Sequence, residues 1–293
     1  MASGFFAILD DIAALMDDVA VASKLATKKT AGIIGADLAV NAEKATGFLS
    51  SRELPVLWAI TKGSFLNKLI ILPIIFGLNW LFPAAIKIIL VIGGLYLAYE
   101  GAEKIIEFFF HKNDHKTEHE EALDVMDDPI AAEKAKVKSA ITTDFILSLE
   151  IVIIALSSAL DKLLMQQIIT VTLVSIIATI GVYGFVVLIV RMVDDGYKLQ
   201  KKSKKEGGIL FNLGQLLINM LPWVIKILGV VGTIALILVA GGIFLHNVEY
   251  LHHLVENLPT PAIVNEFGAG ILGGLLMVIL ITIGKKIISL FKK

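Results

Sequence analysis

Long runs of apolar residues dominate the chain, and charged residues gather between them. Six of these runs are about 20 residues long, the length that an α-helix needs to cross the hydrocarbon core of a bilayer. The pattern predicts six membrane-spanning helices, over residues 66–82, 84–107, 141–160, 167–190, 223–246 and 264–284.

The composition supports an all-α, polytopic membrane protein. Of 293 residues, 56% are hydrophobic and 18% are charged, whereas soluble domains carry about 25% charged residues. The net charge of −1 gives no basic field for nucleic acid, and a sequence without cysteine has neither disulfides nor thiol chemistry. It contains no H-E-x-x-H, G-x-S-x-G or P-loop motif, so we do not expect an enzyme. The expected partner is the lipid bilayer, and homo-oligomerisation is left open.

Lysine and arginine set the expected orientation, because cytoplasmic loops carry an excess of both. Residues 191–208 form a strongly basic loop and 284–293 ends in lysines, whereas 246–266 contains neither residue type. The chain would therefore enter the membrane as three hairpins from the cytoplasm, with a cytoplasmic C-terminus. Lys62 and Lys68, which precede most of the first span, should then lie on the cytoplasmic side.

Residues 5–49 are more polar than the six spans. Four aspartates occupy one arc of the first helical segment: Asp10, Asp11, Asp17 and Asp18. Apolar residues fill the opposite side, which is typical of an amphipathic helix. A second segment, 31–48, carries Asp37, Asn41 and Glu43 and is too polar to face lipid. We therefore predict an acidic helical pair at the N-terminus, in addition to the six spans.

Two stretches of the chain suggest an internal repeat. "PAAIKII" (83–89) and "PWVIKIL" (222–228) share Pro-x-x-Ile-Lys-Ile, and we expect each proline to open its helix. The predicted topology makes the two copies antiparallel, as in inverted-repeat transporters. The repeat would divide one membrane domain into two halves, 1–138 and 139–293.

Two carboxyl groups stand inside the predicted span 141–160. Asp144 should lie one or two turns from the cytoplasmic end and Glu150 near the middle, about 9 Å further along the axis. A charge at this depth costs roughly 2.5–3.5 kcal/mol on insertion scales, so such groups are protonated, paired or bound to a cation. With Ser148 beside them, they offer the oxygen ligands that hard cations prefer.

The same spacing of six residues separates Asp11 from Asp17. We therefore predict that acids of the opening helix and of 141–160 converge on one water-accessible site at the membrane midline. The preferred hypothesis is a transporter for a divalent cation such as Mn²⁺, Mg²⁺ or Ca²⁺, with no other cofactor. Its expected ligands are Asp11, Asp17, Asp18, Asp144, Glu150 and Ser148, followed by Asp37, Asn41 and Glu43.

Two other interpretations stay open. The carboxylates can simply tie helices together, in which case the protein has a structural or scaffolding role. Alternatively, Glu150 carries a proton in proton-coupled solute transport. The aspartates of residues 10–18 can also form the solvated face of an interfacial helix, although such helices usually turn a basic face toward anionic lipid.

Three stretches carry a resemblance to a known family: residues 5–43, "ITTDFILSLEIVIIALS" (141–157) and "MVDDGYKL" (192–199). The chain resembles the YedI-like family of bacterial inner-membrane proteins, which implies that location and no established activity. A weaker similarity is to TerC-like metal exporters, whose membrane helices carry acidic-x-x-Leu-Ser-x-Asp-Asn. The residues that fit this spacing are Asp144, Leu147, Ser148 and Glu150, and in part Asp11, Asp17 and Asp18. Glu150, Ile151 and Ala14-Leu15 depart from the pattern.

Overall fold

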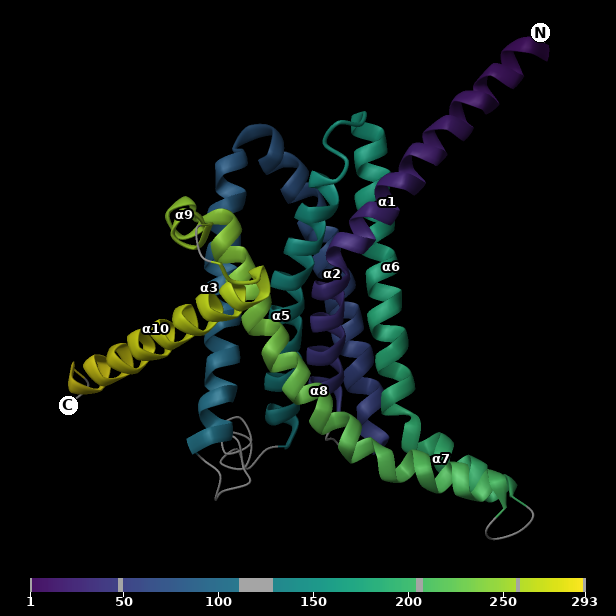
Figure 1. Cartoon of the computed structure of the whole chain (residues 1–293). Coiled ribbons are helices and arrows are strands. Elements are labelled where there is room, and N and C mark those ends of the chain that lie inside the picture. Colours follow the sequence, from purple (N-terminus) through teal and green to yellow (C-terminus); the bar gives the residue numbers. More distant parts are fainter. Residues whose placement is uncertain (1, 47–49, 111–128, 204–207, 257–258, 292–293) are drawn as a thin grey trace.

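The described part of the chain is built from helices alone (Figure 1). The computed structural model describes residues 2–46, 50–110, 129–203, 208–256 and 259–291. Six long helices carry the apolar runs: α2 (Ser50–Leu81), α3 (Pro83–Phe110), α5 (Pro129–Ser157), α6 (Leu164–Val190), α8 (Ile209–Asn247) and α10 (Ala262–Phe291). The remaining helices in these ranges are α1 (Ala2–Ala45), α7 (Met192–Lys202) and α9 (Glu249–Glu256). The predicted all-α class is confirmed.

Each of the six long helices is apolar enough to cross a bilayer, as expected for a multi-pass membrane protein. The spans are Arg52–Leu81, Pro83–Phe108, Glu133–Ser157, Leu164–Val190, Ile209–Asn247 and Ala262–Gly284. The third begins before its predicted start at residue 141, because the preceding "AAEKAKVKSA" is polar yet rich in good helix formers. Asp144 consequently lies near the middle of α5, fifteen residues after Pro129 and thirteen before Ser157, and not one or two turns from the helix end.

The predicted N-terminal pair is one continuous helix, α1. Residues 24–30, "KLATKKT", contain neither proline nor glycine, so nothing separates the two segments. The first part of α1 projects beyond the bundle, and the second part lies inside it (Figure 1). That inner part packs against α5, α6 and α8, and buries Ala26, Val40 and Ala42.

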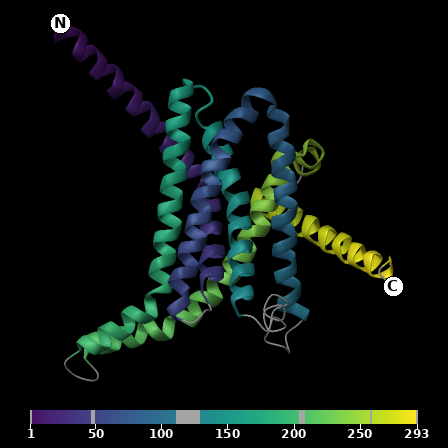
Figure 2. The ribbon, with the colours of Figure 1, turned by 180° about the vertical axis from the view of Figure 1, so that it is seen from behind.

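The helices connect at two ends of the bundle, which we name after Figure 1. Helices α1, α3 and α6 finish at the lower end, where α2 and α5 begin. The junctions from α2 to α3 and from α5 to α6 lie at the upper end, as the view from behind also shows (Figure 2). The core between them contains Leu97, Leu147, Ile151 and Leu236. The described ends thus agree with hairpins that enter from one side.

Pro222 does not open a helix, contrary to the expectation from the repeat. It lies inside α8, which begins thirteen residues earlier at Ile209. The added first part of α8 packs against α7 as a hairpin outside the main bundle (Figure 1). Gly196 and Gly214 allow this contact, because a Cβ atom at either would meet the backbone carbonyl of the other. Pro83 begins α3 as predicted, and the inverted repeat itself stays a prediction.

Glycines also join α10 to the bundle. Little of α10 is buried, yet this helix crosses α8 at backbone contact. A Cβ atom at Gly241 would meet the backbone of Glu266, and one at Gly270 would meet the carbonyl of Ile237. Gly274 likewise lies against the carbonyl of Ala98 in α3. Attachment of α10 therefore depends on glycines more than on interlocking side chains.

Replacement of Gly270 by alanine should destabilise the protein by about 1–3 kcal/mol, because the added methyl group forces α10 away from α8. Gly268→Ala is the matched control on the same helix, since no atom lies within 4 Å of its Cβ position. Thermal unfolding of both variants in detergent measures the difference. Equal melting temperatures would show that the glycine contact does not hold α10.

Candidate functional site

A group of buried polar side chains lies among α1, α2, α5 and α6. Asp144 of α5 is at its centre and is 0% exposed. Its carboxylate accepts three hydrogen bonds, from Ser64 Oγ (2.6 Å), Asn67 Nδ2 (2.9 Å) and Tyr183 OH (3.1 Å). We call this group the central cluster; its members are Asp37, Asn41, Ser64, Asn67, Lys68, Asp144, Ser148 and Tyr183.

Helical spacing gathers these side chains on facing surfaces. On α2, Asn67 and Lys68 follow Ser64 by three and four residues, so all three share one face. The pairs Asp37 and Asn41 on α1, and Asp144 and Ser148 on α5, are each four residues apart. Each helix therefore contributes a short polar stripe, and packing of α1 and α2 against α5 brings the stripes together.

Lys68 supplies a buried positive charge to the central cluster. Its Nζ donates to Ser148 Oγ (2.8 Å) and to Ser64 Oγ (2.9 Å), and lies 3.6 Å from Asp144 Oδ1. Lys68 is buried between the helices, with 5% of the residue exposed, and its predicted place on the cytoplasmic side stays a prediction. Since α2 starts fourteen residues before residue 64, Lys68 belongs to the interior of its span.

Asp37 brings a second buried carboxyl group to the same place. Its Oδ1 accepts a hydrogen bond from Asn41 Nδ2 (2.6 Å), and it interacts electrostatically with both Asp144 and Lys68. The hydroxyl of Tyr183 lies 3.1 Å from Asp144 Oδ1 and 3.3 Å from Oδ1 of Asn41, the residue that donates to Asp37. The cluster thus holds two carboxyl groups and one ammonium group, which leave one negative charge uncompensated if all three are ionised.

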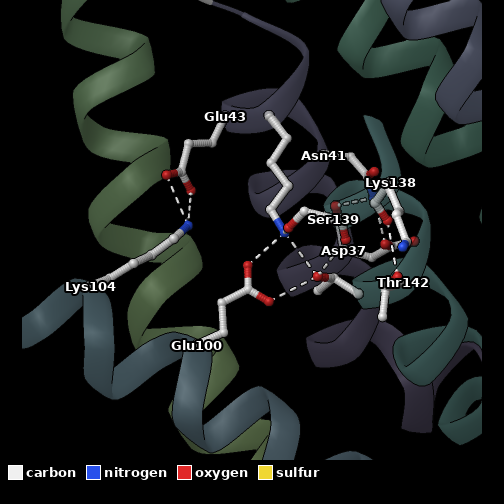
Figure 3. A network of polar contacts seen from close by, with 10 residues as sticks. Asp37, Asn41, Glu43, Glu100, Lys104, Lys138, Ser139 and Thr142 are labelled. Atoms are coloured by element: carbon white, nitrogen blue, oxygen red, sulfur yellow. Dashed lines mark hydrogen bonds and ion pairs between the residues drawn. The ribbon is translucent and has the colours of Figure 1, made fainter. Parts of the chain in front are cut away.

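Figure 3 shows a second polar group, which lies near the ends of α1 and α3 and so toward the lower end of Figure 1. We call it the lysine–glutamate cluster; it comprises Glu43, Lys44, Glu100, Lys104, Ser139 and Thr143. Lys44 Nζ lies 2.5 Å from Glu100 Oε1 and donates to Thr143 Oγ1 (2.8 Å), while Lys104 pairs with Glu43 at 2.7 Å. Two lysines balance two glutamates here. Since Thr143 precedes Asp144, the two clusters adjoin along α5.

The structure brings together only some of the predicted site residues. Asp144, Ser148, Asp37 and Asn41 meet in the central cluster, whereas Glu43 belongs to the lysine–glutamate cluster. Glu150 is on another face of α5, and its Oε2 is buried without a hydrogen-bond partner.

The acids at the beginning of α1 do not reach this site. Asp17 is exposed, and the twenty residues that separate it from Asp37 span about 30 Å of continuous helix. Asp18 accepts hydrogen bonds from Lys162 (3.0 Å) and Gln166 (2.9 Å), and the contact with Lys162 lowers the pKa of this carboxyl group. The predicted convergence is therefore wrong for Asp17 and Asp18. The side chain of Asp11 lies outside the described residues.

Four members of the central cluster were not among the site residues predicted from the sequence: Ser64, Asn67, Lys68 and Tyr183. A usable signal existed in α2, where "SFLNK" (64–68) places polar residues at helical spacing next to an apolar run. Tyr183 gave no such signal, because one tyrosine in a membrane helix is equally consistent with packing. Among the described residues, no three His, Asp or Glu side chains are grouped as a metal centre would require.

Comparison with known protein families covers almost the whole chain. A family described as "Protein of unknown function (DUF808)" matches residues 3–291. The chain belongs to the DUF808 family. The match includes every helix named above, so both polar clusters are parts of the DUF808 domain. No curated protein and no solved structure matches the chain.

Substitution of Lys68 by methionine should destabilise this DUF808 protein by about 3–5 kcal/mol, because Asp144 would remain buried without its cation. Lys62→Met, at an exposed position one to two turns earlier on α2, is the control and should have little effect. A double variant with Asp144→Asn should recover part of the loss, as measured by thermal unfolding. The same loss at both lysines would refute the role of the buried pair.

Proposed function

We propose that this DUF808 protein is a proton-coupled cation transporter of a bacterial inner membrane. One observation carries the proposal: two buried carboxyl groups, Asp37 and Asp144, share the single ammonium group of Lys68 at the centre of the bundle. An uncompensated charge at this depth is costly, so the cluster favours binding of one additional positive charge.

A proton and a metal cation would compete for the same oxygens. With a proton on one carboxyl group, the cluster is neutral and its hydrogen bonds can remain as they are. A metal cation that enters is instead bound by both carboxylates. Its binding displaces the proton and weakens the ion pair between Lys68 and Asp144. Competition of this kind couples cation movement in one direction to proton movement in the other.

The exchanged ion is most simply the divalent cation suggested by the sequence. The carboxylates of Asp37 and Asp144, the amide oxygen of Asn41 and the hydroxyl of Ser148 are hard oxygen ligands of the type that Mg²⁺, Mn²⁺ and Ca²⁺ prefer. The similarity to TerC-like metal exporters supports this choice through Asp144, Leu147 and Ser148. The YedI-like resemblance supports the bacterial inner membrane as the location.

The charge balance argues against a purely structural role for the central cluster. The lysine–glutamate cluster shows what a structural network looks like, since each of its glutamates pairs with a lysine. The central cluster has a surplus acid instead. A scaffold would gain nothing from that surplus, whereas a transporter needs a group that can change its charge.

Reconstitution in liposomes with a pH-sensitive dye inside tests the proposal. An inward gradient of Mn²⁺, Mg²⁺ or Ca²⁺ should drive protons out and make the lumen alkaline, with Na⁺ and K⁺ gradients tested in parallel. Asp144→Asn should slow this exchange at least tenfold. Asp17→Asn, an exposed acid far along α1, should leave it within twofold of wild type.

Proton movement that is unchanged in Asp144→Asn, or absent under every cation gradient, would contradict the proposal. A thermal-shift series with the same ions separates binding from transport, because an ion that binds the folded protein raises its melting temperature.

The proposed orientation, with the lower end in the cytoplasm, can be tested by labelling, since the chain contains no native cysteine. Lys201→Cys lies at the end of α7 and Thr260→Cys lies just before α10. A membrane-impermeant maleimide added to spheroplasts should label the second variant and should label the first only after lysis. The reverse result would invert the topology.

A further inference from the structure

Helix α8 is longer than a membrane span requires. Its 39 residues, Ile209–Asn247, extend for about 58 Å, whereas the hydrocarbon core of a bilayer is about 30 Å thick. The part before Pro222 therefore exceeds the length of a span, and with α7 it forms the hairpin that extends sideways at the lower end of the bundle (Figure 1). We call this unit the α7–α8 hairpin; it comprises residues 192–202 and 209–221.

One face of the α8 part of the hairpin is apolar and exposed. Its residues recur every three or four positions, so they share one side of the helix. Helix α7 does not cover this side, because α8 meets α7 through Gly214 and Ile218, which lie on another face. The exposed apolar residues are Ile209, Leu213, Leu216 and Met220.

The same face continues into the membrane-spanning part of α8. Trp223, Ile227 and Ile234 follow at helical spacing, and all three are exposed. A membrane span turns its exposed apolar face to lipid. Trp223 lies where the hairpin joins the span, and tryptophan is enriched at membrane–water interfaces. Because the apolar face is unbroken, we expect the hairpin to meet the same bilayer.

Polar side chains occupy a different edge of the hairpin. Gln200 of α7 donates a hydrogen bond to Gln215 of α8 (2.8 Å), and Gln215 donates to Asn219 (3.1 Å). These bonds lie at the protein surface, and an amide group has further donors and acceptors that hydrocarbon cannot satisfy. The hairpin is thus amphipathic, which suits the boundary between acyl chains and head groups.

Lysines gather on the side of α7 that faces away from α8. They follow Gly196, which touches α8, by two, five and six residues, so they lie roughly 140–240° around the helix from that contact. The two acids of α7, Asp194 and Asp195, are in its first turn next to the bundle, and Asp195 pairs with Lys198 at 2.8 Å. The far end of α7 is therefore basic. Its exposed lysines are Lys198, Lys201 and Lys202.

We infer that the α7–α8 hairpin lies on the membrane surface at the lower end of the bundle and binds anionic phospholipids. The apolar face of α8 inserts at the boundary between acyl chains and head groups, and the lysines of α7 contact the negatively charged phosphate groups. A second copy of the chain would cover the apolar face but would leave the lysines without a role. The inference does not depend on the proposed transport.

Fluorescence of a label in nanodiscs tests the position of the hairpin, because the chain has no native cysteine. Leu213→Cys places a nitrobenzoxadiazole label on the apolar face, and Lys201→Cys places it among the lysines. The nanodiscs contain phosphatidylcholine and phosphatidylglycerol, with a spin label near the start of an acyl chain as the quencher. Interfacial helices bury their apolar face about 5–10 Å deep, so the label at residue 213 should be quenched about threefold more strongly than the label at residue 201.

The same label at residue 213 measures the preference for anionic lipid. Spin-labelled phosphatidylglycerol should quench it about twofold more than spin-labelled phosphatidylcholine, because the lysines enrich the anionic lipid around the hairpin. Replacement of the three α7 lysines by glutamine should abolish this difference. A matched control removes three exposed lysines of α1 instead and should preserve it; the control positions are Lys24, Lys28 and Lys29.

Gel filtration in detergent establishes that each variant is folded, and each contrary result has a distinct meaning. A label at residue 213 that emits as in water and is quenched by neither lipid would place the apolar face outside the membrane. Disulfide-linked dimers of Leu213→Cys in native membranes would assign this face to a second copy. Equal quenching by the two lipids in the protein with all its lysines would exclude recognition of anionic head groups. A failed exchange assay would leave all these measurements valid.

Discussion

Compensation of buried charge in a low-dielectric interior is the constraint on which this structure depends. An ionised side chain between membrane helices needs an opposite charge and hydrogen-bond donors or acceptors around it, because lipid supplies neither. Asp144 meets this requirement through Lys68 and three donors from α2 and α6. Removal of α2 would take away Lys68 and two of these donors, Ser64 and Asn67, at once.

The same constraint explains the location of α1. This helix is not among the six that are apolar enough to span a bilayer, yet its second half is enclosed by other helices. Asp37 and Lys44 lie on that half, and each finds its partners inside the protein. A polar helix at the centre, surrounded by apolar helices, places ionisable groups in the membrane without contact with lipid.

The amino-acid pattern was sufficient to predict the helical class and the six spans, because an apolar run of the required length has few other interpretations. It was less informative about where helices begin. "AAEKAKVKSA" has good helix propensity and poor hydropathy, so the distance of Asp144 from the start of its helix was misjudged by more than a turn. The continuity of α1 was missed for a related reason, since a change from a polar to an apolar segment resembles a boundary even when no residue breaks the helix.

Only part of the candidate site could be predicted from the sequence. Spacing along one helix indicates which side chains share a face, and Asp144 with Ser148 and Asp37 with Asn41 were found in this way. Which helices then face each other depends on tertiary packing, and Lys68 and Tyr183 came from such pairings. The opening aspartates show the opposite error, because a repeated spacing suggested a shared location for groups that one rigid helix keeps far apart.

The glycine crossing of α8 and α10 has a mechanical consequence. Twenty-one residues of α10 follow Gly270, a length of about 31 Å. A tilt of about 10° around the crossing would displace the far end of the helix by roughly 5 Å and would hardly move Glu266, which lies at the crossing itself. The helix is thus a lever arm whose free end can adapt to the thickness of the surrounding membrane while the carboxyl group at its pivot keeps its place.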